Sequence, residues 1–116
     1  MKERNLILEI SYQFALETIT TAKVLREKKA YELASQFWRA GTSIGANVEE
    51  AQAAQSRADF RSKMSIAAKE ARESHYWLRL ARDSRLLPED DVAPLIEKIE
   101  SIRKILTSIV KSAGEI

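Results

Sequence analysis

The chain has 116 residues and a formal net charge of +2, with 45% hydrophobic and 31% charged residues. This length and composition predict one globular domain over residues 1–116, because so short a chain has room for one apolar core and not for two. The absence of cysteine excludes disulfides and thiolate metal sites, and the single histidine, His75, excludes a multi-histidine metal site. Only three Gly and two Pro favour few, long elements.

The start of the sequence predicts neither export nor membrane insertion. The apolar run Leu6–Leu8 is interrupted by Glu9 after three residues, which is too short for a signal peptide or a membrane span. We therefore expect a cytoplasmic protein without a membrane partner.

The first half of the chain has apolar residues at helical spacing. One stripe consists of Leu8, Tyr12, Ala15, Ile19 and Ala22, and a second, almost in phase with it, of Leu33, Phe37, Ala40 and Ile44. The polar cluster Arg26–Lys29 interrupts this pattern, and an unbroken helix would be longer than globular helices usually are. We place a turn near Lys28, followed by a second helix from about Ala30 to Ala54 with Gly41 and Gly45 as its weak points.

The second half predicts two more helices. Their apolar stripes, in steps of four and three, are Phe60, Met64, Ala67, Ala71, Ser74, Leu78 and Ala81, and then Val92, Leu95, Ile99, Ile102, Leu106, Ile109 and Ala113. Ser56–Asp59 has the pattern of a capping box, so the third helix is expected from about Arg57 to Arg85. Pro88 with three acidic residues opens the fourth, and Gly114 ends it. Such helices predict an all-α, up-down-up-down four-helix bundle.

No set of residues predicts catalysis. The sequence offers no Ser/His/Asp arrangement, no phosphate-binding glycine loop and no cluster with the spacing of metal ligands. Helical bundles hold di-metal sites with Glu-x-x-His elements, but Arg72 stands three residues before His75. We therefore expect no enzyme, cofactor or metal, and interpret His75 as a packed or edge histidine.

A polar strip lies beside the apolar face of the second helix. Its residues are Arg39, Ser43, Asn47 and Glu50, which step by four, four and three positions and so face the same neighbour. One interpretation is a recognition groove. The other, which we favour, is a hydrogen-bonded polar seam that fixes the register of the helices. Gly41 and Gly45, four residues apart, are expected to permit close approach of another helix.

Charge is segregated by helix. Ser56–Arg85 holds eight basic against four acidic residues, a local excess of +4, whereas the second and last segments are each about −2. The predicted nucleic-acid contacts are Arg61, Arg72 and Arg79, with Arg57 and Lys69 beside them. The first three project within about 20° of one another and form a basic rail.

A basic rail of this kind predicts contacts with the phosphates of nucleic acid. The alternative is a solvated face whose charges pair with Asp and Glu of neighbouring helices. No aromatic residue is interleaved with the rail in a way that suggests base stacking, so recognition of the backbone or of shape is expected.

A second set of apolar residues lies away from the predicted core stripes. Its members are Ile7, Phe14 and Leu25 on the first helix, Trp38 on the second, and Ile66, Trp77 and Leu80 on the third. Exposed apolar and aromatic patches usually mark interfaces, so these residues predict a homo-oligomer. The alternative is that wide apolar faces wrap around a single bundle.

The order of residues in the middle of the chain resembles a known family. The stretch Tyr31–Ala51, with Ser56–Phe60 and Ile66–Glu73, is similar to the four-helix-bundle proteins found in 23S rRNA intervening sequences of bacteria. The most specific match is Arg39 followed by Ser43-Ile44, Asn47 and Glu50, since the family carries Arg and then Ser-Ile-Pro-x-Asn-Ile-x-Glu-Gly at this spacing. Gly45 and Ala51 depart from the pattern, standing where many relatives have Pro and Gly.

The resemblance implies an oligomer and a class of partner. Relatives are similar to the accessory proteins of diversity-generating retroelements, which are basic, pentameric rings that engage a reverse transcriptase and nucleic acid. It therefore implies a non-catalytic homo-oligomer, a pentamer by resemblance, whose partners are RNA, DNA or a nucleic-acid enzyme such as a reverse transcriptase. The alternative is a protein-protein interaction module without nucleic-acid affinity, whose binding would not weaken steeply with salt.

Overall fold

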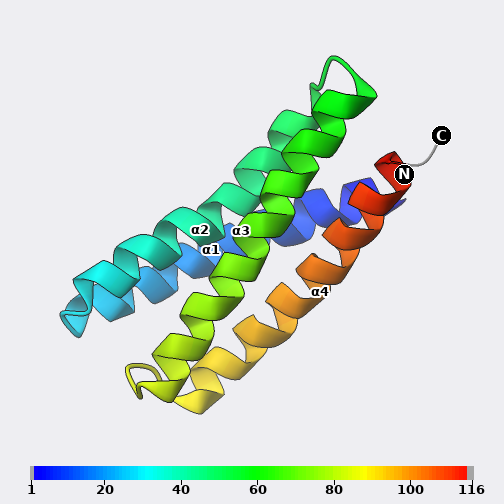
Figure 1. Cartoon of the computed structure of the whole chain (residues 1–116). Helices are drawn as coiled ribbons and strands as arrows, with labels where there is room; N and C mark the ends of the chain where they lie inside the picture. Colours follow the sequence, from blue (N-terminus) through cyan, green and yellow to red (C-terminus); the bar gives the residue numbers. More distant parts are fainter. Residues whose placement is uncertain (1, 115–116) are drawn as a thin grey trace.

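The computed structural model describes residues 2–114, apart from the side chain of Glu3. Its helices are α1 (Lys2–Glu27), α2 (Tyr31–Gln52), α3 (Arg57–Asp83) and α4 (Glu89–Ala113). Successive helices run antiparallel, each packs against the next, and α4 returns to α1, which makes an up-down-up-down four-helix bundle of 47 × 20 × 18 Å (Figure 1). No helix in this part of the chain is long and apolar enough to cross a membrane.

The third helix begins, and the fourth helix begins and ends, at residues that mark helix boundaries in the sequence. Ser56 Oγ accepts a hydrogen bond from the Asp59 amide at 3.0 Å, and the Asp59 carboxylate accepts one from the Gln55 amide at 3.3 Å. The first bond satisfies an amide that the first turn of α3 cannot pair within the helix, and the second satisfies the amide of Gln55, which precedes the helix. Pro88 precedes the acidic first turn of α4, and Gly114 follows its last turn.

The turns after α1 and α3 lie at the same end of the bundle and have the same construction. Lys29 has a φ of 66° and Arg85 a φ of 63°, so each is in the left-handed region. The amide after each of them donates to a carbonyl in the last helical turn, at 2.9 Å after α1 and 3.0 Å after α3. This is the Schellman arrangement that ends many helices. The predicted break near Lys28 is confirmed.

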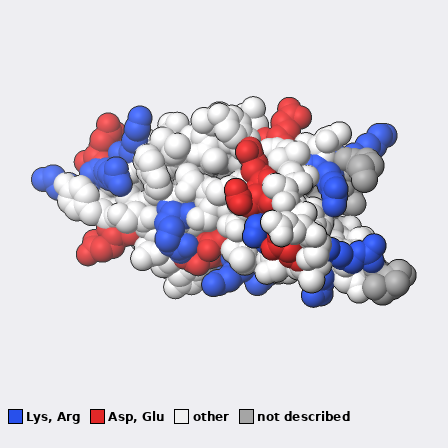
Figure 2. Space-filling view, turned by 90° about the horizontal axis from the view of Figure 1, so that it is seen from above, with Lys and Arg blue, Asp and Glu red and all other residues white. Residues whose placement is uncertain are grey.

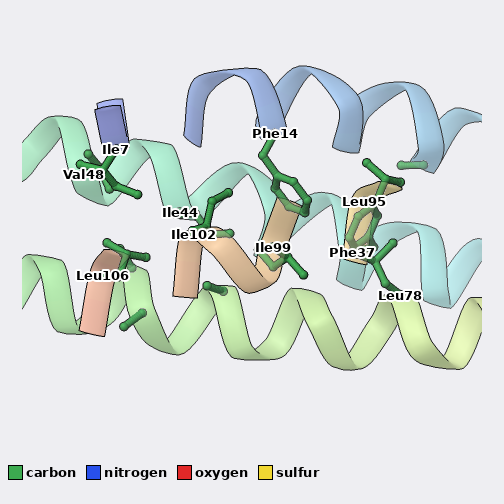
Figure 3. Packing of buried hydrophobic residues seen from close by; sticks show 14 of the residues in the cluster. Ile7, Phe14, Phe37, Ile44, Val48, Leu78, Leu95, Ile99, Ile102 and Leu106 are labelled. Atoms are coloured by element: carbon green, nitrogen blue, oxygen red, sulfur yellow. The ribbon is translucent and has the colours of Figure 1, made fainter. Parts of the chain in front are cut away.

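The core runs along the axis of the bundle, and Figure 3 shows how its side chains interdigitate. The predicted stripes of the third and fourth helices are confirmed: Leu78 is 1% exposed, and Ile99 and Leu106 are fully buried. Phe14 of α1 meets Phe37 of α2 edge to face, with ring centroids 6.2 Å apart. This geometry is one of the favoured arrangements of aromatic pairs.

The predicted core stripe of the first helix is wrong. Tyr12 is 58% exposed, and Leu8, Ala15 and Ile19 are only half-buried. Of that stripe, only Ala22 is buried. The buried face of α1 consists instead of Ile7, Ser11, Phe14, Thr18, Ala22 and Leu25.

The reason is that small polar residues occupy the buried face of α1. Thr18 Oγ1 donates to the Phe14 carbonyl at 2.8 Å, so its hydroxyl is satisfied within its own helix. Thr18 lies against Gly41 of α2, and Ser11 lies against Gly45. The two glycines therefore do allow the helices to approach closely, and this approach excludes large side chains from those positions of α1.

Of the four helix contacts, the one between α1 and α4 is the sparsest. A hydrogen-bonded ion pair bridges the two helices, with Lys98 Nζ 2.8 Å from Glu17 Oε1. Lys98 is therefore engaged in the packing of the bundle and does not stand free at the surface.

Candidate nucleic-acid interface and assembly surface

The structure places the predicted rail on the side of α3 that faces α4, and its arginines differ in their surroundings. Arg61 Nε donates to the Val110 carbonyl at 3.2 Å, so it caps the end of α4. Arg79 lies over the ring of Tyr76, with its Cζ 5.7 Å from the ring centroid. Arg72 is exposed between them. The predicted alignment is present, but one of its three members is held by α4.

The two further members of the predicted set, Arg57 and Lys69, are exposed and lie far from each other along α3. Arg57 opens α3 and, with Arg4, lines a hollow of about 500 Å³ at the end of the bundle that carries both termini. On the face seen in Figure 2, Lys and Arg side chains gather around this end, at the right of the picture. Lys69 precedes Arg72 by three residues and so continues the exposed strip of α3.

Each acidic residue of α3 has a basic partner. The pairs are Asp59 with Lys63, Asp83 with Arg82, and Glu70 and Glu73 with Arg39 of α2. Hydrogen bonds from Lys63 and Arg82 lower the pKa of Asp59 and of Asp83, respectively. None of these basic partners is Lys69, Arg72 or Arg79. Those three residues take part in no ion pair among the described residues. Pairing with neighbouring acids, the alternative for the rail, does not occur at these three.

Arg103 of α4 extends the basic strip across to a second helix. Its Nη1 lies 3.2 Å from Nδ1 of His75 on α3. Arg72 and Arg79 flank His75 on the same side of α3, three residues before it and four after it. The guanidinium of Arg103 therefore joins theirs at the α3–α4 boundary.

The basic end of α4 was not predicted, because its charge is masked by acidic residues when the helix is taken as a whole. Its acidic residues end at Glu100, whereas Arg103, Lys104 and Lys111 follow and line a shallow hollow of about 680 Å³ together with Glu100. A count over half-helices would have found this asymmetry. We call the α3–α4 basic surface the set Lys69, Arg72, Arg79, Arg103, Lys104 and Lys111.

His75 connects the two helices beneath this surface. Its side chain is 15% exposed, and its Nε2 lies 3.9 Å from Glu100 Oε2. Burial, and then the charge of Arg103, lowers the pKa of His75 below its ordinary value. The neutral ring accepts from Arg103 at Nδ1, which agrees with the interpretation of His75 as a packed histidine.

The polar strip of α2 joins it to α3 through one side chain. Arg39 Nη1 donates to Glu70 Oε1 at 3.0 Å, and Arg39 also pairs with Glu73. Trp77 Nε1 donates to the same Glu73 carboxylate at 3.2 Å. These bonds link fixed positions on the two helices, so they favour one register.

The other members of the strip make their bonds within α2. Ser43 Oγ donates to the Arg39 carbonyl at 2.5 Å, and Asn47 Nδ2 donates to the Ser43 carbonyl at 2.9 Å. Glu50 is exposed. These contacts fit the hydrogen-bonded seam better than the recognition groove. The seam joins the two helices through fewer residues than expected, because only Arg39 contacts α3.

Three predicted interface residues belong to the core. Ile7 and Phe14 are fully buried and Leu25 is 1% exposed, so their assignment to the surface is wrong. The error has the same cause as the wrong core stripe, because the buried face of α1 is the one that contains Ser11 and Thr18. Trp38 and Trp77 are half-buried and pack against the core. Ile66 and Leu80 are exposed, as the interface prediction requires.

Several exposed and half-buried apolar residues form two faces on different helices. The α1 apolar face consists of the exposed Tyr12 and Leu16 with the half-buried Leu8 and Ile19, and the α3 apolar face of the exposed Ile66 and Leu80. The helices α1 and α3 do not pack against each other, so they occupy diagonal corners of the bundle. The two faces therefore lie at different corners of the bundle.

Comparison with known proteins places the chain in a family. The model of the family described as 23S rRNA-intervening sequence protein matches residues 3–108. A solved structure of a protein of unknown function from the S23 ribosomal protein family of Bacteroides thetaiotaomicron VPI-5482 is similar, with 38% identity and a TM-score of 0.90 over 94% of this chain and 98% of that one. No curated protein matches. The chain belongs to the 23S rRNA-intervening sequence protein family, as its central motif had indicated.

Proposed function

We propose that this protein is a non-catalytic, self-associating bundle that holds nucleic acid by its phosphates along the α3–α4 basic surface. The observation that supports this is the state of Lys69, Arg72 and Arg79, which lack carboxylate partners among residues 2–114 while every acid of α3 is paired elsewhere. Unpaired cations on one side of a helix are suited to displace the counterions of a phosphate backbone.

Self-association supplies what a single bundle lacks. A net charge of +2 produces only a weak long-range field. A repeated assembly presents the α3–α4 basic surface several times, so that weak phosphate contacts add by avidity. An assembly of this kind also suits an adaptor that brings a nucleic-acid enzyme to its template.

The two apolar faces suggest how copies associate. Because the α1 and α3 apolar faces differ and lie on helices that do not pack against each other, the α1 face of one copy is suited to cover the α3 face of the next. Such a head-to-tail contact closes into a ring or continues as a filament. The family resemblance implies the ring, as a pentamer.

Salt-dependent binding tests the nucleic-acid part of the proposal. The double variant Arg72→Gln with Arg79→Gln should bind RNA and DNA more weakly than the wild type, and log Kd should depend less steeply on log salt concentration. The matched control is Lys23→Gln with Lys28→Gln, which removes the same charge from exposed positions at the α1 side. Equal losses in both would indicate attraction by net charge alone.

Lys98 is not a suitable control, because its replacement also breaks the ion pair with Glu17. If the wild type binds neither RNA nor DNA at low salt, where screening is weakest, the nucleic-acid proposal fails. The exposed α1 apolar face then favours a protein-protein interaction module instead.

A mixing experiment tests the head-to-tail contact. Leu16→Glu breaks the α1 apolar face and Leu80→Glu breaks the α3 apolar face, so each variant alone should sediment as a monomer. Mixed in equal amounts, they retain one intact face each that is complementary to the other, and should form a dimer. Failure of the mixture to associate, or a wild type that is monomeric at micromolar concentration, contradicts this mode of assembly.

A further inference from the structure

Tyr76 lies inside the α3–α4 basic surface. It follows Arg72 by four residues and precedes Arg79 by three, so the three side chains share one strip of α3. Its side chain is 47% exposed. No aromatic residue was expected among the rail in a way that suggests base stacking, but the exposed ring of Tyr76 lies between Arg72 and Arg79 in the sequence and on the same strip of α3.

The ring of Tyr76 is held in place by its neighbours. It meets the ring of Trp77 edge to face, with centroids 5.0 Å apart and an interplanar angle of 70°. Trp77 is half-buried and anchored by its hydrogen bond to Glu73. The guanidinium of Arg79 lies over the Tyr76 ring, 5.7 Å from the centroid. A ring restrained in this way loses little conformational freedom when a ligand covers it.

The carboxylates nearest to Tyr76 on α3 are already engaged. Glu73 accepts hydrogen bonds from Arg39 and Trp77, and Asp83 accepts from Arg82. The cations that pair with these carboxylates, Arg39 and Arg82, do not belong to the α3–α4 basic surface. An anionic ligand at Tyr76 therefore meets Lys69, Arg72 and Arg79 without an unpaired carboxylate of α3 beside it.

We propose that Tyr76 is a stacking platform for an unpaired base, and that the ligand of the α3–α4 basic surface is single-stranded nucleic acid. This inference rests on the proposed function and names its substrate class. Proteins that bind single strands combine a basic surface that follows the phosphates with aromatic rings on which bases stack. A duplex keeps its base faces covered, so it would use the cations and leave the ring without a partner.

The experiment compares Tyr76→Leu with Tyr76→Phe and with Tyr31→Leu, which removes a tyrosine that is 57% exposed at the start of α2. Affinity is measured at fixed low salt for a labelled single-stranded RNA, a single-stranded DNA and a duplex of the same sequence. Tyr76→Leu should weaken single-strand binding by at least about fivefold, the lower limit for one stacked base. Duplex binding should not change, and Tyr76→Phe and Tyr31→Leu should bind like the wild type.

The two single-stranded arms identify the source of the ligand, since the tighter of RNA and DNA in the wild type is the one recognised. If Tyr76→Leu weakens the binding of single strand and duplex equally, or weakens the binding of neither, the stacking proposal is overturned. The proposed function survives that result provided that Arg72→Gln with Arg79→Gln still flattens the salt dependence. A change in assembled mass on Tyr76→Leu would show a protein contact and would also overturn stacking. Absence of any wild-type binding overturns both proposals.

Discussion

Gly41 of α2 lies directly against Thr18 of α1. A Cβ atom built on Gly41 would be 2.3 Å from Thr18 Oγ1, 2.6 Å from its Cγ2 and 2.9 Å from its Cβ. Rotation about χ1 does not relieve the contact with Cβ, and the hydroxyl is held by the Phe14 carbonyl. At Gly45 there is more room, because the nearest atom, the carbonyl oxygen of Ser11, would be 3.3 Å away.

We expect Gly41→Ala to lower the free energy of unfolding by about 1 to 3 kcal/mol, the usual cost of overpacking. The better helix propensity of alanine, about 1 kcal/mol, offsets only part of the clash. Gly45→Ala is the matched comparison: its Cβ would still make a tight contact with the Ser11 carbonyl oxygen, but a milder one, so it should cost clearly less than Gly41→Ala. Urea denaturation of both variants measures the difference, and a Gly41→Ala protein as stable as the wild type would contradict the close contact.

The phase of α1 predicts opposite outcomes for two neighbouring aromatic residues. Phe14→Ala removes a fully buried ring and should cost about 3 to 5 kcal/mol of unfolding free energy. Tyr12→Ala changes a side chain that is 58% exposed and should change stability by no more than about 0.5 kcal/mol. Thermal denaturation followed by circular dichroism tests both, and similar losses would mean that α1 is rotated from the described position.

Glycine should stabilise the two left-handed turns. Lys29 and Arg85 occupy φ values of 66° and 63°, a region in which a Cβ atom costs about 1 kcal/mol. Lys29→Gly and Arg85→Gly should therefore each raise the unfolding free energy by up to about 1 kcal/mol. Lys28→Gly, one residue away in a conformation with negative φ, should instead be destabilising, because glycine gains only unfolded-state entropy there. Loss of stability in the first two variants would refute this account.

His75 should make the stability of the protein depend on pH. Burial and Arg103 lower its pKa below the ordinary value of 6.5, so the unfolded chain binds this proton more readily than the folded one. The contribution of the neutral ring is present in full above pH 6.5, and it declines as the pH falls from 6.5 toward the folded pKa. Chemical denaturation between pH 5 and 7.5 measures this slope.

Because the chain has a single histidine, His75→Gln should flatten that slope. The loss of stability at lower pH should persist in the variant, since Asp59 and Asp83 have pKa values below their ordinary 3.8. Each of these carboxylates contributes stability above 3.8 that is lost as the pH falls through its folded pKa. An unchanged slope between pH 5 and 7 in His75→Gln would assign the effect to other groups.

The fold and most of its boundaries follow from local patterns in the sequence. Leu78, Ile99 and Leu106 are buried where the steps of four and three place them. The capping pattern from Ser56 opens α3 as predicted. These signals are reliable because amide satisfaction at a helix end and the burial of one apolar stripe depend on residues within a few turns of each other.

The face of α1 could not be predicted from its own residues. A hydropathy pattern assigns Tyr12 to the core and leaves Ser11 and Thr18 outside it, whereas contact with Gly41 and Gly45 of α2 decides the opposite. Close packing of α1 on α2 at these glycines requires small side chains at Ser11 and Thr18, and the Thr18 hydroxyl is satisfied inside α1.

Part of the candidate site likewise follows from the sequence, and part depends on how the helices pack. The sequence by itself determined the family motif and the alignment of Arg72 with Arg79, because both depend on spacing along one helix. Only the tertiary structure decided that Arg61 is held by the end of α4 and that Arg103 joins the basic strip. Charge pairing is a property of distances between helices, and these distances exist only once the four helices have packed.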